Sequence, residues 1–399
     1  MANQRYLSAQ EVAAELGISV QTVYAYVSRG LLRSEREGGH AHRYLRDDVD
    51  TLKQRKEGRR NPTAVAASAL YWGTPVLDSS IALIADEQLY YRGYRATRLA
   101  VERSIEQVAA LIWLGNLADR DPLFRNVQPI SAHVPRPDLA PLDAFSAVLP
   151  VAALDDLAAY DLRPAALART GARVLHLLTA VAAGTAQVES SIAQTLARRW
   201  APDDERALPL LNAALILCAD HELNVSSFTA RCVASAGAPL YAVVSAGLAA
   251  LSGIKHGKQT EWAVQLLADL APVADVRTAL AHKLKLGQAI PGFGHVLYPG
   301  GDPRGRLLLE LVSAAYPAAP TVTLATSLVS AAREVLGDHP TLDLGLAVVS
   351  RALRLPPGGA LGLFALGRTV GWIGHALEQY AEDKLIRPRA RYVGEMPRG

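Results

Sequence analysis

Apolar residues recur along most of the chain with the spacing of helices. From about Thr97 onward, nearly every segment repeats apolar side chains with the period of a helix and is rich in Ala and Leu, both strong helix formers. Proline and glycine interrupt this pattern at 126–141 and 299–303. Upstream, SSIALIADEQLYYRGY has β-prone runs on both sides of residues 85–87, which predicts one small hairpin. The pattern therefore predicts a large all-α domain with a minor β-hairpin.

Residues 7–55 have a different pattern, that of a small helical module. Ser8 and Glu11 have the spacing of a capping box for a first helix, and Gly17 opens the turn to a second. In the second helix Val23 and Val27 face inward, which leaves a polar outer face made of Gln21, Thr22, Tyr24, Ser28 and Arg29 before Gly30 ends the helix. Two helices joined by a short turn with glycine form the helix-turn-helix pattern.

A basic segment follows the second helix. Between Leu31 and Tyr44, basic side chains surround a glycine pair, as in a basic hairpin or wing: Arg33, Arg36, His40, His42 and Arg43. A last helix is expected from about Asp47. With LSAQEVAAELGISVQTVYAYVSRGLL and HRYLRDDV, this region resembles the DNA-binding domains of MerR-like regulators and phage excisionases.

That resemblance implies a winged helix-turn-helix domain that binds duplex DNA. The second helix would enter the major groove through Gln21, Thr22 and Tyr24. Arginines would make the other contacts, mainly to phosphates: Arg29, Arg33, Arg36 and Arg43. The alternative is a protein-interaction or dimerisation module, because a charge of +3 is modest for a DNA-binding domain.

Charge and composition divide the chain in the same place. The 399 residues are 50% hydrophobic and 20% charged, as in globular proteins. Residues 1–60 carry eleven Lys and Arg against eight Asp and Glu, so the whole formal charge of +3 lies there. The charged, proline-containing stretch 57–64 is expected to be a linker. We therefore expect a first domain at 1–60.

Cysteines and apolar runs bear on the compartment. Cys218 and Cys232 are too few for a disulfide framework, and the polar start MANQRYLSAQ lacks the apolar run of a signal peptide. The most apolar stretches, 207–219 and 239–254, are shorter than the roughly 20 residues that a membrane-spanning helix needs. We expect a cytoplasmic protein that does not bind membranes.

Four polar clusters interrupt the apolar helical background. They are ADHELNVSSF (219–228), GIKHGKQTE (253–261), IPGFGHVLYPGGDPR (290–304) and TLDLGLAVV (341–349). Their histidines lack the His-x-x-x-His or Cys-x-x-Cys spacing of a zinc site, so no metal is expected. Taken alone, each histidine is compatible with a satisfied core residue, and Asp343 with a helix cap.

Arginines in unusual places indicate anions nearby. Asp302 and Pro303 have the pattern of an N-cap and first helical residue, so Arg304 stands in the first turn, where the helix dipole disfavours a cation. Arg368 lies inside the apolar run ALGLFALGRTVGWIGHAL and needs a carboxylate or phosphate, from a ligand or from an internal Asp or Glu. Arg387, near the C-terminus, would by default be solvated.

In their order along residues 70–399, these pieces resemble the citrate synthase family. The resemblance rests on DHELNVS, the glycine-flanked His256, PGFGHVLYPGGDPR, the Asp343 segment, FALGRTVGWIGH and RPRARYVG. IADEQLYYRGY also resembles the N-terminal hairpin of that family. The resemblance implies an all-α homodimer whose large domain, 61–253 and 355–399, and small domain, 254–354, close over the substrates.

The chemistry of the family then falls on residues already singled out. By resemblance, Asp343 removes a proton from the acyl-CoA, His256 hydrogen-bonds the thioester oxygen, and His295 polarises the oxaloacetate carbonyl and protonates the new alkoxide. Oxaloacetate would be bound by His221, Asn224, Arg304, Arg368 and, from the other subunit, Arg387. Acyl-CoA would be a substrate, so no separate cofactor is expected.

The sequence departs from the family pattern at three places. Family members usually have Asn four residues after the second histidine, where this chain has Thr260, and GIKHGKQTE adds two lysines beside His256. Those ammonium groups would lower the pKa of His256 and attract a more anionic ligand. Cys218 stands where the family often has another histidine, and Val296 where it often has arginine. The length of the acyl chain therefore stays open.

Two functions fit these residues. The first is an enzyme that condenses acetyl-CoA or propionyl-CoA with oxaloacetate to citrate or 2-methylcitrate; Asp343, the two histidines of the reaction and the arginines favour it. The second is a transcriptional regulator that senses a metabolite through a citrate synthase-like body; the basic N-terminal module and the altered GIKHGKQTE favour it. A protein with both functions is the third possibility.

Overall fold

The computed structural model describes residues 6–29, 31–37, 41–46, 48–49, 52–53, 77–117, 122–130, 138–188, 191–390 and 392–397. The chain forms two compact units that divide after Asp78. Several expected features lie outside the described residues: the linker at 57–64, the helix end at Gly30, the side chain of Arg36, His40 and the start of a helix at Asp47. The division of the second unit into a large and a small domain stays a prediction.

The first unit is a helix-turn-helix with a small antiparallel sheet. The predicted capping box of Ser8 and Glu11 starts α1 (Ala9–Leu16), Gly17 ends it with a φ of 58°, and α2 (Val20–Ser28) follows. The sheet has the order β1-β3-β2, from β1 (Tyr6–Ser8), β2 (Ser34–Glu37) and β3 (Ala41–Leu45). β2 and β3 are the predicted wing. β1 was not expected, because three residues are too few to show an alternating pattern.

A single apolar core holds this unit together. Residues from both helices, the sheet and the turns between them are buried in it: Leu7, Val12, Leu16, Val23, Leu32, Tyr44 and Val49. Val12 and Val23 are completely buried, as the helical periodicity predicted. The core therefore buries one face of each helix and leaves the polar face of α2 exposed.

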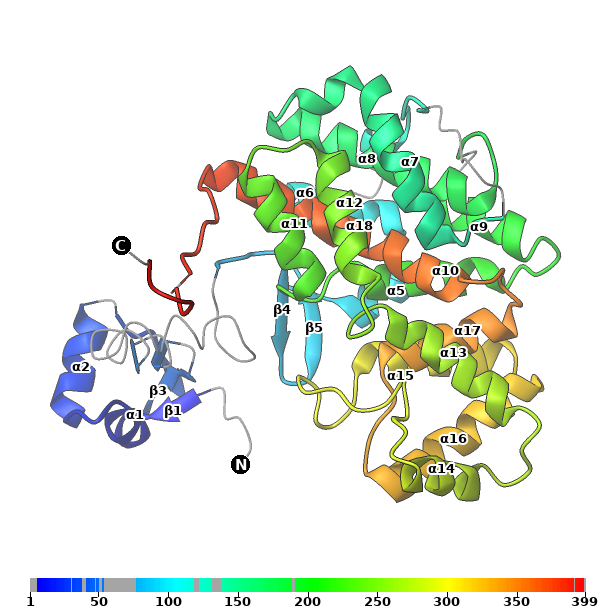
Figure 1. The fold of residues 1–399 in the computed structure, drawn as a ribbon. Helices are drawn as coiled ribbons and strands as arrows, with labels where there is room; N and C mark the ends of the chain where they lie inside the picture. Colours follow the sequence, from blue (N-terminus) through cyan, green and yellow to red (C-terminus); the bar gives the residue numbers. More distant parts are fainter. Residues whose placement is uncertain are drawn as a thin grey trace. The chain divides into compact units, whose positions relative to one another are not determined.

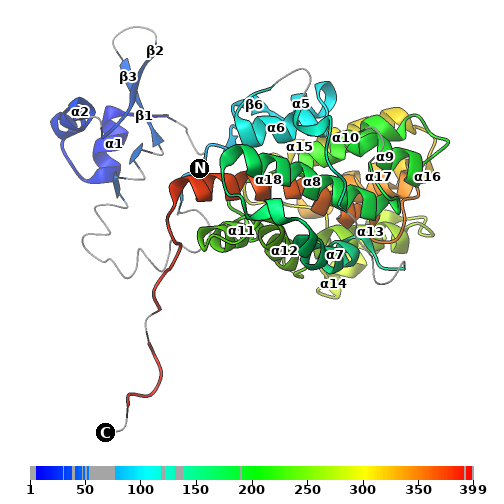
Figure 2. The same ribbon diagram turned by 90° about the horizontal axis from the view of Figure 1, so that it is seen from above.

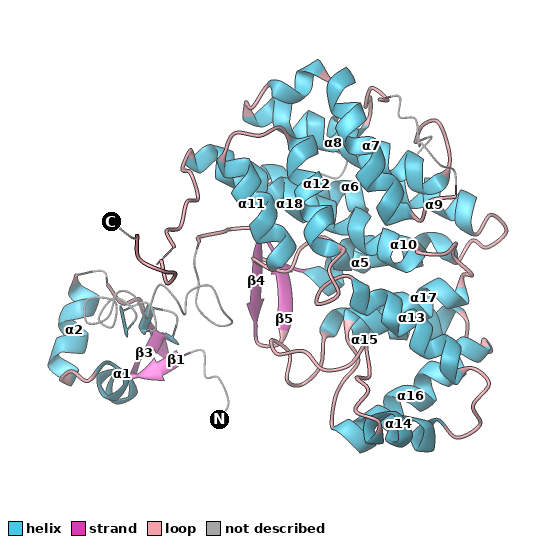
Figure 3. Cartoon of the chain, in the orientation of Figure 1, coloured by secondary structure: helices cyan, strands magenta, loops and turns pink. Residues whose placement is uncertain are grey.

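The second unit is built almost entirely of helices (Figure 3). Its helices are α5 (Ala96–Glu102), α6 (Ile105–Leu114), α7 (Pro141–Asp155), α8 (Pro164–Ala183), α9 (Ile192–Trp200), α10 (Ala207–Cys218), α11 (Val225–Ser235), α12 (Leu240–Leu251), α13 (Lys258–Leu270), α14 (Val276–Lys285), α15 (Pro303–Ala315), α16 (Pro320–Leu336), α17 (Leu342–Ala352) and α18 (Gly359–Glu382), with short 3₁₀ helices at Pro122–Phe124 and Leu157–Tyr160. The all-α prediction is confirmed.

The long helix α18 is the centre of this unit. It packs against α6, α8, α10, α11, α12 and α17, and its side chains from Gly359 to Ala376 are all buried. Figure 1 shows α18 running through the middle of the helices, with α13 to α17 gathered at one end. A helix that is apolar on every side must lie inside a large core, which explains why Arg368 is buried.

The predicted hairpin lies at the start of the second unit. β4 (Ala82–Ala85) pairs antiparallel with β5 (Gln88–Tyr91) through a turn at Asp86 and Glu87, both with positive φ, and β6 (Tyr94–Arg95) adds a short third strand. Positive φ at both central residues gives the turn the right-handed twist of the strands that it joins. The hairpin is the only sheet described in this unit.

Glycines let α18 approach the first polar cluster closely. A Cβ on Gly371 would lie 2.3 Å from the carbonyl oxygen of Ala219 and 2.5 Å from Oδ1 of Asp220. We expect Gly371→Ala to lower the free energy of unfolding by about 1–3 kcal/mol, because backbone atoms cannot move aside. Urea unfolding measures this. Gly171→Ala, where the nearest atoms are side-chain atoms at 3.0 Å, is the comparison and should cost less; an equal cost would contradict the explanation.

Candidate active site

The first polar cluster lies in the turn between α10 and α11. The hydroxyl of Tyr91 in β5 lies 3.2 Å from the carbonyl oxygen of Asp220 and ties the hairpin to this turn. Asn224 caps α11, because its Oδ1 accepts hydrogen bonds from two backbone N–H groups of the first turn. The turn places His221 inside the body, with 8% of its surface exposed. A substrate contact of Asn224 stays a prediction, and the observed role of this side chain is the cap.

Backbone hydrogen bonds hold the glycine-rich loop from two sides. The N–H of Gly300 donates to Glu87 at the tip of the hairpin, at 2.8 Å. On the other side, the N–H of Gly294 donates to the carbonyl of His339, and that of Thr341 to Gly292, both at 2.9 Å. These bonds fix the loop that carries His295 against the segment that leads into α17.

Three rings and a guanidinium meet where this loop faces His221. Nε2 of His221 lies 3.0 Å from the Tyr298 hydroxyl, and the ring centroids of His221 and His295 are 5.2 Å apart. The guanidinium of Arg304 lies 5.6 Å from the centre of the Tyr298 ring. Burial, and then the charges of Arg304 and Arg368, hold the pKa of His221 well below its ordinary value. His221 is therefore a neutral imidazole at pH 7.

The tautomer of His295 follows from its neighbours. Its Nδ1 accepts a hydrogen bond from the backbone N–H of Leu297, at 3.2 Å. Burial, and then the charge of Arg304, lower the pKa of His295, so the ring is neutral at pH 7. A neutral ring whose Nδ1 is an acceptor carries its proton on Nε2. His295 therefore offers an N–H donor through Nε2.

Arg304 has an anion beside it, and the anion belongs to the chain itself. Its Nε and a terminal nitrogen each donate to Asp302 at 2.9 Å, and both side chains are buried. Asp302 also accepts a hydrogen bond from the N–H of Leu342 at 3.0 Å, which links the starts of α15 and α17. Although burial raises it, Arg304 holds the pKa of Asp302 below its ordinary value. The anion expected near Arg304 is thus present without a ligand.

Asp343 is not a helix cap. Thr341 occupies the N-cap position of α17, and Asp343 stands in the first helical turn, so the interpretation as a cap is wrong. Its Oδ1 accepts a hydrogen bond from the hydroxyl of Thr260 in α13, at 2.5 Å. Burial raises the pKa of Asp343, as suits a general base that has to work near neutral pH.

His256 lies just before α13 and faces the cap of α11. Its Nε2 is 2.8 Å from Oγ of Ser226, and its ring meets Phe364 edge-on at 6.0 Å. Burial, and then Arg368, lower the pKa of His256 to about 4. The expectation that neighbouring lysines would cause this is wrong: Lys258 is paired with Glu261 at 2.6 Å, and Lys255 is exposed.

Arg368 is buried without a carboxylate bound to it. It has 1% of its surface exposed, and its Nε donates to the carbonyl oxygen of Cys218 at 2.7 Å. Among the described residues no Asp or Glu forms an ion pair with it. Burial lowers the pKa of Arg368, and the charge of the nearby Asp220, which does not pair with it, offsets only part of this cost of burying a cation. An anionic ligand would remove that cost.

Arg387 is not part of the site within its own chain. The segment after α18 is extended and exposed, and Figure 2 shows it leaving the helices of the unit. The last hydrogen bond described between this segment and the helices joins the N–H of Ile386 to Ser235, at 3.1 Å. Arg387 follows immediately and is exposed.

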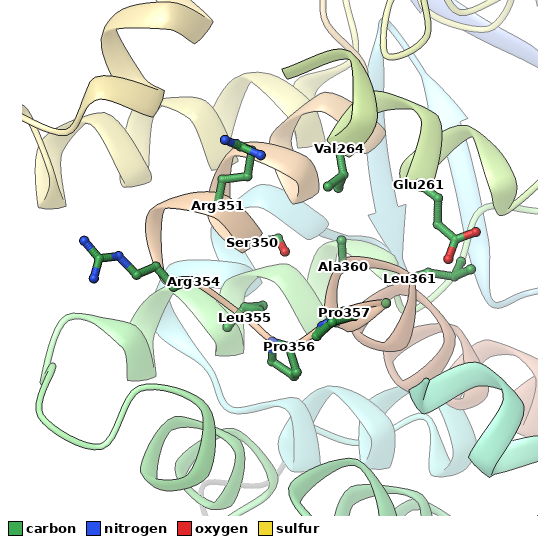
Figure 4. Close-up of a pocket in the computed structure, with 12 residues that line it drawn as sticks. Glu261, Val264, Ser350, Arg351, Arg354, Leu355, Pro356, Pro357, Ala360 and Leu361 are labelled. Carbon is green, nitrogen blue, oxygen red and sulfur yellow. The ribbon is translucent and has the colours of Figure 1, made fainter. Parts of the chain in front are cut away.

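A cavity lies at the other end of α17, lined also by the loop that joins α17 to α18. Its volume is about 470 Å³, and its walls come from α13, the last turn of α17 and the first turn of α18. Figure 4 shows Glu261, Ser350 and Arg351 on these walls. None of the expected site residues lines it. The described residues also contain no group of three His, Cys, Asp or Glu side chains that could hold a metal ion.

The expected DNA-binding residues differ in how they are placed. Gln21, Tyr24, Arg29 and Arg43 are exposed, with 53% of Tyr24 accessible. The hydroxyl of Thr22 instead pairs with that of Ser19 at 2.9 Å, at the start of α2. Arg33 forms a bidentate ion pair with Asp48. Thr22 and Arg33 are thus already engaged within the unit.

Comparison with known proteins identifies both units. A model of the citrate synthase C-terminal domain matches residues 70–389. The chain belongs to the citrate synthase family. A second model, of a helix-turn-helix domain, matches residues 6–57. The chain thus joins a helix-turn-helix domain to a citrate synthase body, as the two resemblances predicted.

Relatives cover nearly all of this citrate synthase body. Citrate synthase 2 of Bacillus subtilis is 28% identical over 81% of this chain and 94% of its own. The 2-methylcitrate synthase of Shewanella oneidensis is 32% identical, over 47% of this chain and 51% of its own. A ternary complex of the Thermoplasma acidophilum enzyme with carboxymethyl coenzyme A and oxaloacetate has the same fold, at 22% identity and a TM-score of 0.71, over 82% of this chain and 95% of that one.

Two further findings concern cofactors and membrane-spanning helices. Citrate synthases use no cofactor besides their CoA substrate. In the described part of the chain, no helix is both long and apolar enough to cross a membrane.

Some contacts around the expected site residues were not predicted from the sequence. Ser226 contacts His256, Tyr298 contacts His295, and His375 in α18 lies 3.1 Å from Asp220. Asp220 and His375 are fully buried, and one further atom of each has no hydrogen-bond partner among the described residues. All of these residues lie within the quoted motifs, which was the available signal. Their partners are distant in sequence, so no local pattern could pair them.

Proposed function

We propose that the protein condenses an acyl-CoA, acetyl or propionyl, with oxaloacetate to give citrate or 2-methylcitrate and CoA. The observation that carries the proposal is the buried Arg368, which has no carboxylate partner among the described residues and faces the same cluster as His221 and Arg304. A dicarboxylate substrate would supply the missing anion, and guanidinium groups bind carboxylates in a bidentate manner.

Asp343 acts as the base in this proposal. Its carboxylate takes a proton from the carbon next to the thioester carbonyl, the electron pair of that C–H bond forms a C=C bond, and the π pair of the C=O bond moves to the thioester oxygen as the enolate forms. The base must be ionised and must also be basic enough to take the proton. Burial raises the pKa of Asp343 and so makes its carboxylate more basic.

His256 stabilises the thioester oxygen, and Ser226 sets its tautomer. In the structure the Ser226 hydroxyl lies 2.8 Å both from Oδ1 of Asn224 and from Nε2 of His256. A neutral His256 can donate to the thioester through Nδ1 only if Nε2 accepts. In the structure the Ser226 hydroxyl donates its one proton to Asn224, so it must turn that proton to His256 when substrate binds, while Asn224 keeps its two backbone donors. The cap of α11 thus supports the reactive histidine.

His295 completes the condensation. The carbon of the enolate attacks the carbonyl carbon of oxaloacetate, and the carbonyl oxygen takes a proton from Nε2 of His295, the nitrogen that carries it in the structure. Asp343 releases its proton to water, from which the His295 ring is reprotonated. Water then hydrolyses the thioester of the citryl-CoA or methylcitryl-CoA product, which releases CoA. Preorganised neutral donors of this kind stabilise charge that develops in a transition state.

A homodimer is part of the proposal. The extended segment after α18 exposes apolar side chains that its own chain does not cover: Leu385, Tyr392, Val393 and Met396. Such side chains favour docking on another surface, and Arg387 lies among them. We propose that this segment binds a second subunit and brings Arg387 to the oxaloacetate carboxylates there.

Thiol release from purified protein tests the activity. Acetyl-CoA and propionyl-CoA are each supplied with oxaloacetate, and free CoA is measured with a thiol reagent. The faster of the two acyl-CoAs identifies the product as citrate or 2-methylcitrate. Absence of release with both, from protein that is folded and dimeric, would reject the enzymatic proposal.

The helix-turn-helix domain favours a second proposal, binding to duplex DNA. The specific observation is the exposed face of α2, with Gln21 and Tyr24, on a unit that carries the whole excess of positive charge. We propose that α2 enters the major groove. The citrate synthase body would then act as a metabolite sensor, alone or in addition to its catalysis.

DNA affinity should fall steeply with salt. Arginines that contact phosphates release counterions, so Arg43→Ala should lower the slope of log affinity against log salt by about one unit. Filter binding or fluorescence anisotropy with a pool of genomic fragments measures this. Arg98→Ala, an exposed arginine of the citrate synthase body, is the control and should leave the slope unchanged. Binding that is equal at low and high salt would favour a protein-interaction module instead.

A further inference from the structure

Thr260 touches the carboxylate that the proposed reaction needs as a base. It stands in the first turn of α13, is fully buried, and donates its hydroxyl proton to Oδ1 of Asp343 at 2.5 Å. In the described part of the chain, the one hydrogen bond to the other carboxylate oxygen, Oδ2, comes from the hydroxyl of Thr341, at 3.5 Å, the limit for such a bond. The two oxygens of Asp343 are therefore in different environments.

The charged and titratable groups around Asp343 act on it without touching it. They are Asp302, Arg304 and Cys218, while Lys258 and Glu261 in the first turn of α13 are paired with each other. Arg304 favours the ionised carboxylate and Asp302 opposes it, while these two are paired with each other. The hydroxyl of Thr260 is thus the closest group that distinguishes the ionised from the protonated carboxylate.

We propose that Thr260 is a positioning residue, which holds Oδ1 of Asp343 so that Oδ2 is the atom that takes the substrate proton. This inference rests on the condensation proposed above. A donor on Oδ1 fixes the plane of the carboxylate and stabilises its ionised form. The hydrogen bond between Thr260 and Asp343 also joins the first turns of α13 and α17. His256 lies just before the start of α13, and Asp343 lies in the first turn of α17. The residue that departs from the family pattern thus has a defined task.

Thr260→Val removes the hydroxyl and keeps the shape of the side chain. We expect kcat to fall roughly 10- to 100-fold, because a loosened base is misaligned. The Michaelis constant for oxaloacetate should change less than threefold, since its ligands are untouched. Without the donor the pKa of Asp343 rises, so the base stays protonated to higher pH. The acid limb of the pH profile should therefore move up by about one unit.

Two variants control this experiment. Thr260→Ser keeps the hydroxyl and should retain most of kcat and the wild-type pH profile. Thr179→Val removes a buried hydroxyl of α8 that bonds its own helix, and should alter neither. A folded Thr260→Val protein with the wild-type profile, or a serine variant that falls as far as the valine variant, would overturn the proposal.

Thermal unfolding gives a readout that does not depend on activity. The pKa of Asp343 is raised on folding, and loss of the Thr260 hydroxyl raises it further. The carboxyl of Asp343 therefore keeps its proton to a higher pH in the folded variant than in the folded wild type. Since a pKa raised on folding makes stability fall as the pH rises, the stability of the variant falls further than that of the wild type. The difference in Tm between wild type and Thr260→Val should therefore grow as the pH rises through the raised pKa of Asp343 in the folded protein.

The same comparison of Tm values, made with Asp343→Asn present in both proteins, tests whether Asp343 is the titrating group. There the difference in Tm should no longer depend on pH, because the titrating group is gone. A pH dependence that persists would overturn the proposal. If the wild type condenses neither acyl-CoA, the proposed function fails, and this cycle still shows whether Thr260 holds Asp343.

Discussion

Asp343→Asn is expected to lower the rate of condensation by roughly 100- to 10,000-fold, the usual contribution of a positioned general base. An amide of the same shape cannot accept the substrate proton. Affinity for oxaloacetate should stay near the wild-type value, because the arginines and His221 are unchanged. Single-turnover kinetics with acyl-CoA and calorimetric titration with oxaloacetate measure the two effects separately.

A matched variant separates this loss from a general effect of the substitution. Asp275→Asn makes the same change at an exposed N-cap, that of α14, where the side chain accepts a hydrogen bond from Thr278. It should leave condensation unchanged. Wild-type turnover in Asp343→Asn would mean that the base is another residue.

Arg387→Ala should abolish most activity, and mixing should restore part of it. Loss of a buried charge partner costs about 2–5 kcal/mol, which corresponds to roughly a 30- to 5,000-fold loss. If Arg387 serves the neighbouring subunit, each homodimer of Arg387→Ala or Asp343→Asn lacks one residue in both sites. In a heterodimer of the two variants, one site has both residues intact, and activity returns there.

The experiment needs verified subunit exchange and a control from the same segment. Arg389→Ala changes an exposed arginine two residues further on and should keep most activity. No recovery in proven heterodimers would place Arg387 in the site of its own chain or in none.

Local features of the structure followed from the sequence because their interactions are local. The capping box of Ser8 and Glu11, the hairpin turn at Asp86 and Glu87, and the wing of the helix-turn-helix all join residues a few positions apart. The helical content of the body follows from apolar periodicity for the same reason. The resemblance to citrate synthases then identified the body over residues 70–399, and the family model matches residues 70–389.

Partners within the site followed only from the tertiary structure. Arg304 and Arg368 are both buried arginines in apolar surroundings, yet Arg304 is paired with Asp302 and Arg368 with no carboxylate among the described residues. The sequence predicted an anion near each and could not say which anion was internal. Similarly, the lysines beside His256 indicated the wrong cause of its low pKa, since Lys258 pairs with Glu261 and burial acts instead.

The sequence by itself therefore determined the helix-turn-helix unit, the citrate synthase body and their helices, while the set of reactive side chains stays a prediction from the resemblance. The two units and their helices depend on composition, periodicity and short-range interactions, which can be read directly from the sequence. The tertiary structure decided which atoms of those side chains are engaged: Nδ1 of His295 by Leu297, and Oδ1 of Asp343 by Thr260. Protonation state and orientation depend on burial and on neighbours brought together from distant segments, so only the packed fold could set them.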